Sequence, residues 1–414
     1  MAESPLRRPE FRRLLAISVT VALGFGMVIP VLPLYAKSFG VQLAAIGSVQ
    51  LVFGLTRFSF GLVGGFMVDR YGERACTVAG LLVVSASSFA AGFAHSFTQL
   101  VAARGFGGAG SALFIAGLNN RILRIIEPAA MGRATGVFRS SFLVGIGVGP
   151  ALGGLIATRY GLAAPLIFYA TGLLIATAIA WKVMAGEERA DAAARRSPAE
   201  ALRAARPLFS DRRYVIALLA TMVGWWTIAG PTQTVGPVYA AESLGMSEDQ
   251  IGFAVTMLAI GEILVLLVAG RASDRYGRRA VLLPSLAIGA IATALLGQVE
   301  RLDGAGIAAY YPLMIVIGAS IAAGSTAAGG LLADAIPRAG SGAAVGVNQM
   351  AGDLGYLLSP TTIGYAAQRH GFGPAYVLAA LPAAAVAAAA LRLPNGTPAA
   401  RAEPAEPEPA EPIG

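Results

Sequence analysis

The sequence predicts an all-α membrane protein with twelve transmembrane helices in two pseudo-symmetric sets of six. Three observations support this fold class. Hydrophobic residues make up 56% of the 414 residues, and the mean hydropathy is +0.67, which leaves too little polar surface for a soluble chain of this length. Apolar runs of spanning length recur along the chain, and charged residues gather in the connectors between them.

The apolar runs fall into two sets of six. Each run is close to or longer than the roughly 20 residues that an α-helix needs to cross about 30 Å of hydrocarbon. We therefore expect an N-terminal six-helix bundle over 14–184 and a C-terminal one over 213–393. The expected spans are 14–36, 43–66, 76–94, 99–121, 134–158 and 164–184, then 213–240, 249–270, 280–298, 308–332, 342–366 and 374–392.

Polar segments flank and separate the two bundles. Residues 1–13 are basic, 185–212 form the longest polar stretch inside the chain, and 394–414 are rich in Pro and Glu. We expect a short cytoplasmic N-terminus, a cytoplasmic linker that cannot span, and a disordered cytoplasmic tail. The first apolar run shows no clear cleavage site, which favours a retained span over a signal peptide.

Positive charge indicates the orientation. With the N-terminus inside, the outer loops hold only Lys37, Arg159, Arg301 and Arg369 of the 31 Arg and Lys residues. Cytoplasmic loops of membrane proteins carry the excess of Lys and Arg. We therefore expect a multi-pass protein of the inner membrane with both termini in the cytoplasm. The formal charge of +8 forms no basic face, so nucleic acid is not an expected partner.

One charged turn occurs twice. GFMVDRYGER at 65–74 returns as GRASDRYGRR at 270–279, and 136–161 aligns with 346–371, so the bundles are two copies of one repeat. A hydrated loop explains the arginines but not an acid and glycines at the same places in both copies. We expect a cytoplasmic gate in which glycines allow close approach and tight turns while a carboxylate accepts hydrogen bonds. The gate residues are Gly65, Asp69, Arg70, Gly72, Arg74, Asp274, Arg275 and Gly277, with Gly270 as the counterpart of Gly65.

Twelve spans in two repeats, with this turn in each, resemble the major facilitator superfamily of secondary transporters over residues 10–393. The resemblance implies that the two bundles rock about a cavity open to one side at a time. It also implies that Asp69, between spans 2 and 3, helps to stabilise the outward-facing state, with Asp274 in the second copy.

Two motifs inside the spans resemble motifs of particular branches of this superfamily. Arg104 lies at membrane depth, where a charge costs at least about 2.5 kcal/mol and normally faces the bundle interior, although it could instead snorkel outward. Its pattern R-x-x-x-G-x-G resembles a span-4 motif associated with proton transfer. In span 5, glycines recur every four residues on one helix face beside a proline that bends the span, a pattern that resembles the drug/proton antiporters. Its residues are Gly145, Gly149, Pro150, Gly153 and Gly154.

Other polar side chains inside the spans are candidates for coupling and binding. Glu262 and Asp353 lie near the midplane, where a carboxyl group favours its neutral form and can carry a proton. Each could instead form a static pair with an arginine, and Arg57, the repeat counterpart of Glu262, is the candidate partner. We expect Glu262, Asp353 and Arg104 to couple transport to protons. The candidates for the substrate cavity are Arg57, Asn119, Trp226, Gln233, Asn348 and Gln349.

The sequence therefore predicts a monomeric, proton-coupled antiporter that exports small lipophilic or drug-like organic compounds by alternating access, as in multidrug resistance. Proton-coupled uptake of a small metabolite is the first alternative, and the span-5 glycines argue against it. A non-transporting membrane receptor or an enzyme on the same scaffold is the second, but no clustered catalytic set supports it. The expected partners are a small organic substrate, protons and the lipid bilayer, with no other cofactor and no metal.

Overall fold

A computed structural model describes residues 9–126, 131–184, 206–302, 304–336 and 341–393, and the described chain is helical with no strand. The predicted linker up to residue 205 and the predicted tail lie outside the described residues, as do residues 1–8.

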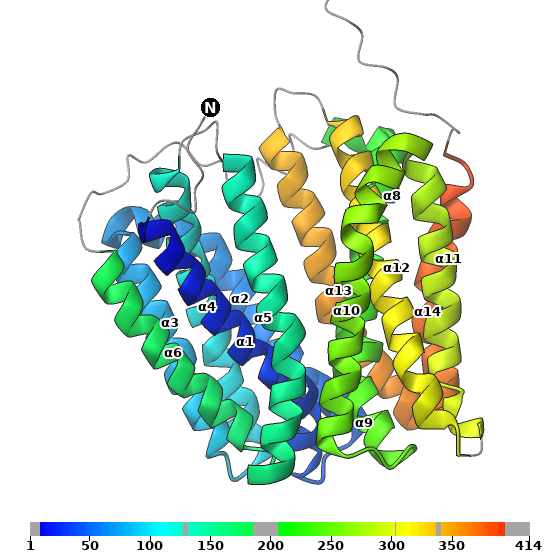
Figure 1. The fold of residues 1–414 in the computed structure, drawn as a ribbon, viewed down its shortest axis with the longest axis horizontal. Coiled ribbons are helices and arrows are strands. Elements are labelled where there is room, and N and C mark those ends of the chain that lie inside the picture. The colour runs from blue at the N-terminus through cyan, green and yellow to red at the C-terminus, as the bar shows by residue number, and fades with distance from the viewer. Residues whose placement is uncertain (1–8, 127–130, 185–205, 303, 337–340, 394–414) are drawn as a thin grey trace, which may run out of the picture.

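The first six helices form one bundle (Figure 1). Its core lies where α1, α3, α4 and α6 pack together, and the α1 side chains of Phe11, Leu14 and Ile17 are fully buried in it. The helices are α1 (Pro9–Lys37), α2 (Leu43–Tyr71), α3 (Glu73–Gly92), α4 (Phe97–Ile125), α5 (Met131–Tyr160) and α6 (Ala164–Val183).

The second bundle repeats this plan with one interruption. The span predicted over 213–240 is three consecutive segments, because a π-helix that contains Pro231 replaces α-helix in its middle; proline lacks the N–H that an α-helical turn uses. Its elements are η3 (Arg206–Ser210), α8 (Arg212–Thr227), η4 (Ile228–Thr234), α9 (Val235–Glu242), α10 (Glu248–Tyr276), α11 (Arg278–Leu296), η5 (Val299–Arg301), α12 (Gly306–Ala335), α13 (Ser341–His370) and α14 (Phe372–Ala390).

Eleven helical segments in the described part of the chain are long and apolar enough to cross a membrane. The remaining long helix, α13, has 30 residues, enough for about 45 Å at 1.5 Å per residue. Polar residues such as Asn348, Gln349 and Asp353 lower its hydropathy. Since α13 packs against α2 of the other bundle and α8 of its own, much of its surface faces protein. The predicted twelve-helix, two-bundle fold is confirmed.

The two bundles meet through equivalent helices. α2 packs against α13, and α5 packs against α10, as a repeat related by pseudo-two-fold symmetry requires. We call the edge of the protein where α1 begins and α14 ends the terminal edge, and the opposite edge the far edge (Figure 1). In Figure 1, α5 and α10 meet toward the far edge and diverge toward the terminal edge.

The repeated charged turn is shorter than the sequence suggested. α2 continues to Tyr71 and α3 begins at Glu73, so only Gly72 breaks the helix, with φ of 86°. Gly277 does the same between α10 and α11, with φ of 94°. Residues other than glycine rarely adopt this conformation, so both turns require glycine at these positions. Most residues of the repeated charged turn are helical. The helices continue past the ends of the apolar runs because helical residues satisfy their backbone hydrogen bonds within the helix.

Candidate functional site

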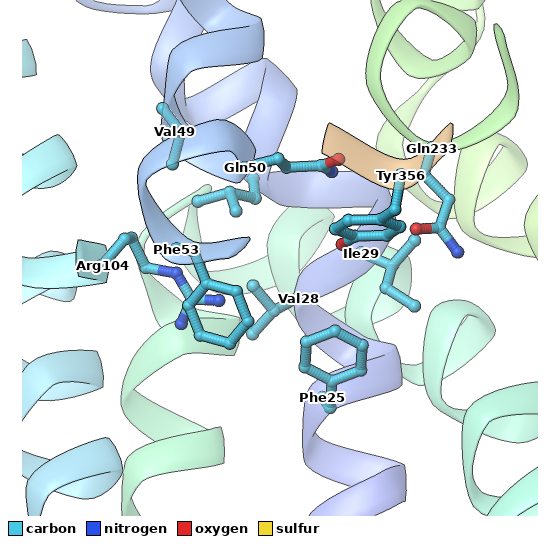
Figure 2. A pocket seen from close by; sticks show the side chains of 10 residues that line it. Phe25, Val28, Ile29, Val49, Gln50, Phe53, Arg104, Gln233 and Tyr356 are labelled. Carbon is cyan, nitrogen blue, oxygen red and sulfur yellow. The ribbon is translucent and has the colours of Figure 1, made fainter. Parts of the chain in front are cut away.

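A pocket lies between the bundles on the far-edge side of the molecule. The side chains of α1 and α2 that line it are mostly apolar, and one residue each comes from α4, η4 and α13. In this conformation the enclosed space among them is about 20 Å³, enough for roughly one water molecule, and it reaches about 340 Å³ only when the part open to solvent is counted. Its polar members are Gln50, Arg104, Gln233 and Tyr356, and Figure 2 shows Gln233 and Tyr356 together on one side, with Arg104 on the other.

Close packing of α4 against α2 places Arg104 in this pocket. A Cβ on Gly108 would overlap the carbonyl oxygen of Phe53 and the hydroxyl of Thr56, so only glycine allows this approach. Thr56 Oγ1 also donates to the carbonyl oxygen of Gly105 at 2.7 Å. The Arg104 guanidinium, one turn before Gly108, therefore lies over the Phe53 ring, with its carbon 4.9 Å from the ring centroid.

The Arg104 side chain is deeply buried and poorly paired. The residue is 3% exposed, and neither Nε nor Nη1 has a hydrogen-bond partner. Among the described residues it makes no ion pair with a carboxylate, and the ionisable groups acting on it are the hydroxyls of Tyr169 and Tyr356. The aromatic face of Phe53 offsets part of the charge. Arg104 thus faces the interior, and the snorkelling alternative does not apply.

The two candidate proton-coupling acids lie on different sides of the interface between the bundles. Glu262 is half-buried in the middle of α10, and Asp353 is half-buried on α13. Arg57 was the candidate partner of Glu262 in the static-pair alternative, but among the described residues its positive charge acts on Asp353. The repeat explains the difference: α2 meets α13 while α10 meets α5, so equivalent positions on α2 and α10 lie apart. Glu262 forms no ion pair with any described residue.

The candidates for the substrate cavity separate into three groups. Gln233 lines the pocket. Trp226 does not: its indole Nε1 donates to the Ala379 carbonyl oxygen at 3.1 Å inside the second bundle. Asn348 Oδ1 accepts from Thr221 Oγ1 at 2.9 Å, and Gln349 Nε2 donates to Asp353 Oδ1 at 3.5 Å. Asn119 and Arg57 are exposed and lie outside the pocket lining.

Sequence reasoning missed most of the pocket. Gln50, Phe25, Phe53 and Tyr356 all line it, and none of them was a candidate. The only signal in the sequence was the amide of Gln50 within an apolar run, which alone does not distinguish a pocket from a helix contact.

The glycines of α5 pack against α1 with no room for a side chain. A Cβ on Gly145 would lie 2.7 Å from Ala22 Cβ, and one on Gly149 would lie 2.5 Å from the Leu23 carbonyl oxygen. A Cβ on Gly153 would overlap the Met27 carbonyl oxygen. Gly154 instead faces α10, where a Cβ would lie 2.9 Å from Asp249 Cα.

Beside the same face, Pro150 lies inside α5, and the next backbone N–H, that of Ala151, donates to Thr256 Oγ1 of α10 at 3.1 Å. α5 therefore joins its own bundle to the other one near the far edge.

At the terminal edge, an ion-pair cluster that no sequence motif singled out holds the first bundle together. Glu73 lies at the start of α3 with its side chain 5% exposed. Its carboxylate is 3.1 Å from Arg124 Nη2 and 3.8 Å from Arg121 Nη1, both on the last turns of α4. Arg121 also donates from Nε to Glu10 Oε1 of α1 at 2.7 Å. The cluster connects three helices of one bundle.

The second bundle makes the equivalent contact with the charges reversed. Arg278, at the start of α11, donates from Nε to Asp334 Oδ2 of α12 at 3.2 Å and also pairs with Asp274. In the repeat alignments Arg278 stands where Glu73 stands, and Asp334 stands where Arg124 stands. Each bundle therefore has an ion pair between its third and fourth helices, and the acidic and basic partners are exchanged between the two bundles. We call these two ion pairs the brackets.

Only some of the predicted gate residues form ion pairs; others stack on aromatic rings. Asp274 accepts from Arg278 within its own bundle, while Arg70 and Arg275 lie exposed over the rings of Tyr71 and Tyr276. The side chain of Arg74 stacks on Trp181 of α6, with its guanidinium carbon 4.0 Å from the ring centroid. Gly65 lies within α2, and the side chain of Asp69 lies outside what the structure describes. A Cβ on Gly270 would have no described neighbour within 4 Å, so the close approach predicted for it is absent in this conformation.

An ion pair and several hydrogen bonds join the two bundles at the far edge, and we call this set of contacts the far-edge lock. Lys37 Nζ at the end of α1 is 3.0 Å from Glu242 Oε1 at the end of α9. Gln368 of α13 donates to Gln42 and accepts from the backbone N–H of Ala44 at 3.4 Å. Thr158 of α5 accepts from the backbone N–H of Asp249 at 3.1 Å. No ion pair or hydrogen bond joins the bundles at the terminal edge within the described ranges.

The sequence matches the family model of the Major Facilitator Superfamily over residues 14–239 and 232–414. The chain therefore belongs to this superfamily and is a multi-pass membrane protein. It is 30% identical over 155 residues to an uncharacterised MFS-type transporter of Methanocaldococcus jannaschii, a match that covers 37% of this chain and 40% of the relative. It is 29% identical over 137 residues to the quinolone resistance protein NorA of Staphylococcus aureus, covering 33% of this chain and 35% of that protein. These matches thus span two fifths or less of the relatives' lengths.

Solved structures share the fold at low identity. A bacterial homologue of the human lysosomal transporter Spinster, inward-facing and unoccupied, superposes with a TM-score of 0.75 at 15% identity, covering 94% of this chain and 97% of that one. The nucleoside transporter NupG, as a D323A mutant, gives a TM-score of 0.74 at 15% identity over 92% and 99% of the two chains. A D-xylose–proton symporter gives 0.72 at 15% identity over 93% and 98%.

Proposed function

We propose that this transporter is a proton-coupled antiporter that exports small lipophilic or drug-like organic compounds by alternating access, through the inner membrane. The observation that carries the proposal is Glu262: a half-buried carboxyl in the middle of α10, in the interior of a membrane bundle, without an ion-pair partner among the described residues. Intramembrane ionisable groups are rare and mark ion or substrate pathways. The glycine face of α5 and the similarity to NorA favour export over uptake.

The excess of Lys and Arg places the terminal edge in the cytoplasm under this proposal. The far edge, with its Lys37–Glu242 lock, then faces outward, and the bundles part toward the cytoplasm. Closing the cytoplasmic side would bring the gate turns and their brackets together and would break the far-edge lock. The charged gate residues Asp69, Arg70, Asp274 and Arg275 would make their contacts between bundles in that second state.

In this proposal the carboxyl groups of Glu262 and Asp353 both carry protons that are coupled to transport. Asp353 has the positive charge of Arg57 acting on it, whereas no arginine in the described part of the chain acts on Glu262, so the two acids hold a proton in different electrostatic surroundings. Arginine keeps its proton in proteins. Arg104 therefore contributes to coupling as a fixed charge in the pocket and not as a proton carrier.

The test is proton release from inverted membrane vesicles. In vesicles acidified inside by respiration, norfloxacin or another carboxylated quinolone added outside should collapse the pH gradient, because antiport moves protons out as substrate moves in. Glu262→Gln should abolish the response and Asp353→Asn should weaken or abolish it. Glu300→Gln, which neutralises an exposed carboxyl at the far edge, should leave it unchanged.

Transport of these compounds that is indifferent to the pH gradient would remove the antiport proposal. A symporter carries protons in the same direction as its substrate, so substrate added outside would not release protons from the lumen. Unchanged coupling in both neutral variants would remove Glu262 and Asp353 as the proton sites while leaving antiport standing.

A further inference from the structure

The pocket contains a positive charge that no carboxylate among the described residues balances. Arg104 is almost completely buried, and two of its three guanidinium nitrogens lack a hydrogen-bond partner. Removing a cation from water carries a penalty of several kcal/mol, which only a well-placed anion or hydrogen-bond acceptors can offset. The Phe53 ring supplies only part of that compensation. A buried, unpaired arginine that lines a pocket is therefore a site prepared for an anion.

A second polar side chain nearby is also unsatisfied. Gln50 lies one helical turn before Phe53 on α2, is 9% exposed, and its Oε1 has no hydrogen-bond partner. Buried polar groups of this kind are normally paired, so this unpaired acceptor indicates a hydrogen-bond donor from outside the chain, such as a water molecule or an N–H or O–H group on the occupant, and not the anion itself. Figure 2 shows Gln50 on the pocket wall between Arg104 on one side and Tyr356 on the other.

The remaining lining indicates the shape of the occupant. The rings of Phe25, Phe53 and Tyr356 come from three helices and face the same space (Figure 2). Aromatic rings of this kind bury flat apolar groups and add geometric preference to the area they cover. A guanidinium offers two parallel N–H groups that match the two oxygens of a carboxylate.

We propose that the pocket binds an organic anion, in which a carboxylate pairs with Arg104 and an attached aromatic body lies among Phe25, Phe53 and Tyr356. The inference rests on the proposed function, since it names the class of compound that the exporter carries. It also explains why Arg104 has no acidic partner among the described residues: a resident carboxylate would satisfy the guanidinium and compete with the substrate.

The test compares two probes that differ in one charge. 2-Naphthoate and 2-naphthamide share an aromatic body, and only the first is an anion at pH 7.5. Binding to the purified full-length protein in lipid nanodiscs, without a pH gradient, should be at least about tenfold tighter for 2-naphthoate, as expected for a charge-assisted bidentate pair worth about 1.4 kcal/mol or more. Arg104→Gln should remove this preference, and Arg104→Lys should keep part of it. Arg159→Gln, at the exposed end of α5, should keep all of it.

If Arg104→Gln does not fold, the difference between 2-naphthoate and 2-naphthamide binding to the wild-type protein still tests the proposal. A second anion, 2-naphthalenesulfonate, should bind the wild type as tightly as 2-naphthoate. Equal binding of the acid and the amide, binding of neither, or a preference that survives in Arg104→Gln overturns the proposal. Anion preference without proton release in the vesicle assay would contradict antiport alone. Proton release without anion preference would contradict only the substrate class.

Discussion

Gly153→Ala is expected to destabilise the folded protein by about 1–3 kcal/mol, the usual cost of forcing an extra carbon into a packed core. The new Cβ would overlap the Met27 carbonyl oxygen and lie 2.6 Å from Met27 Cα, so α1 and α5 would have to separate along their shared face. These contacts are backbone atoms, which cannot move aside as a flexible side chain can. The melting temperature of the purified protein in detergent should fall, and export in the vesicle assay should fall with it.

Gly172→Ala is the matched control, because it adds the same carbon to another helix that packs on α1. Its Cβ would meet Thr20 Cγ2 at 3.6 Å, an ordinary van der Waals distance. The melting temperature of this variant should stay near that of the wild type. Equal melting temperatures for Gly153→Ala and Gly172→Ala would show that the α5 glycines are not required for close packing.

Glu73→Gln is expected to destabilise the protein by about 1–3 kcal/mol, since it removes the charge that faces Arg121 and Arg124 at the start of α3. The Glu73 side chain is only 5% exposed, so water cannot replace the lost interaction. The fall should appear as a lower melting temperature in detergent, compared under one heating rate because unfolding of a membrane protein of this size is not expected to be reversible.

Arg278→Gln changes the equivalent position in the second bundle and is the comparison. Its partners are more exposed, Asp334 at 36% and Asp274 at 72%, and exposed ion pairs contribute about 1 kcal/mol or less. Arg278→Gln should therefore lower the melting temperature less than Glu73→Gln. The reverse order would mean that burial does not set the strength of the two brackets.

The fold class and the internal repeat were predictable because span length, positive charge in loops and duplicated motifs are properties of short stretches of chain. The tight turns at Gly72 and Gly277 and the packed glycine face of α5 followed from the same local patterns. The interruption of the seventh span was less visible, although Pro231 within it is a known cause of irregular helix.

The pocket could not be predicted in the same way. Phe25, Gln50 and Tyr356 come from three helices and meet only after the bundles pack, so no pattern in one span identifies them. The supposed pair of Arg57 with Glu262 failed for the same reason, because the repeat sets equivalent helices against different partners.

Unlike the pocket, the two charge-reversed ion-pair clusters could have been predicted from the sequence. The alignment of the two repeats already places Glu73 opposite Arg278 and Arg124 opposite Asp334. A search for paired charge reversals between the copies would have found them.

Rocking of the two bundles should open the terminal and far edges alternately as intramembrane acids gain and lose protons. Cys76 is the only cysteine and is buried, so a Cys76→Ser background accepts spin labels at chosen sites. One pair, Tyr71→Cys with Tyr276→Cys, reports on the terminal edge. The other, Phe93→Cys with Leu302→Cys, reports on the far edge, and all four side chains are exposed.

Double electron–electron resonance distances for both pairs, measured in nanodiscs from pH 5.5 to pH 8.5, distinguish this motion from a rigid scaffold. Proton-driven rocking predicts two distance populations for each pair, whose proportions change with pH in opposite directions at the two edges. In Glu262→Gln combined with Asp353→Asn, the proportions should no longer depend on pH. Distances that do not change at either edge, or that lengthen at both edges together, would contradict proton-driven alternating access.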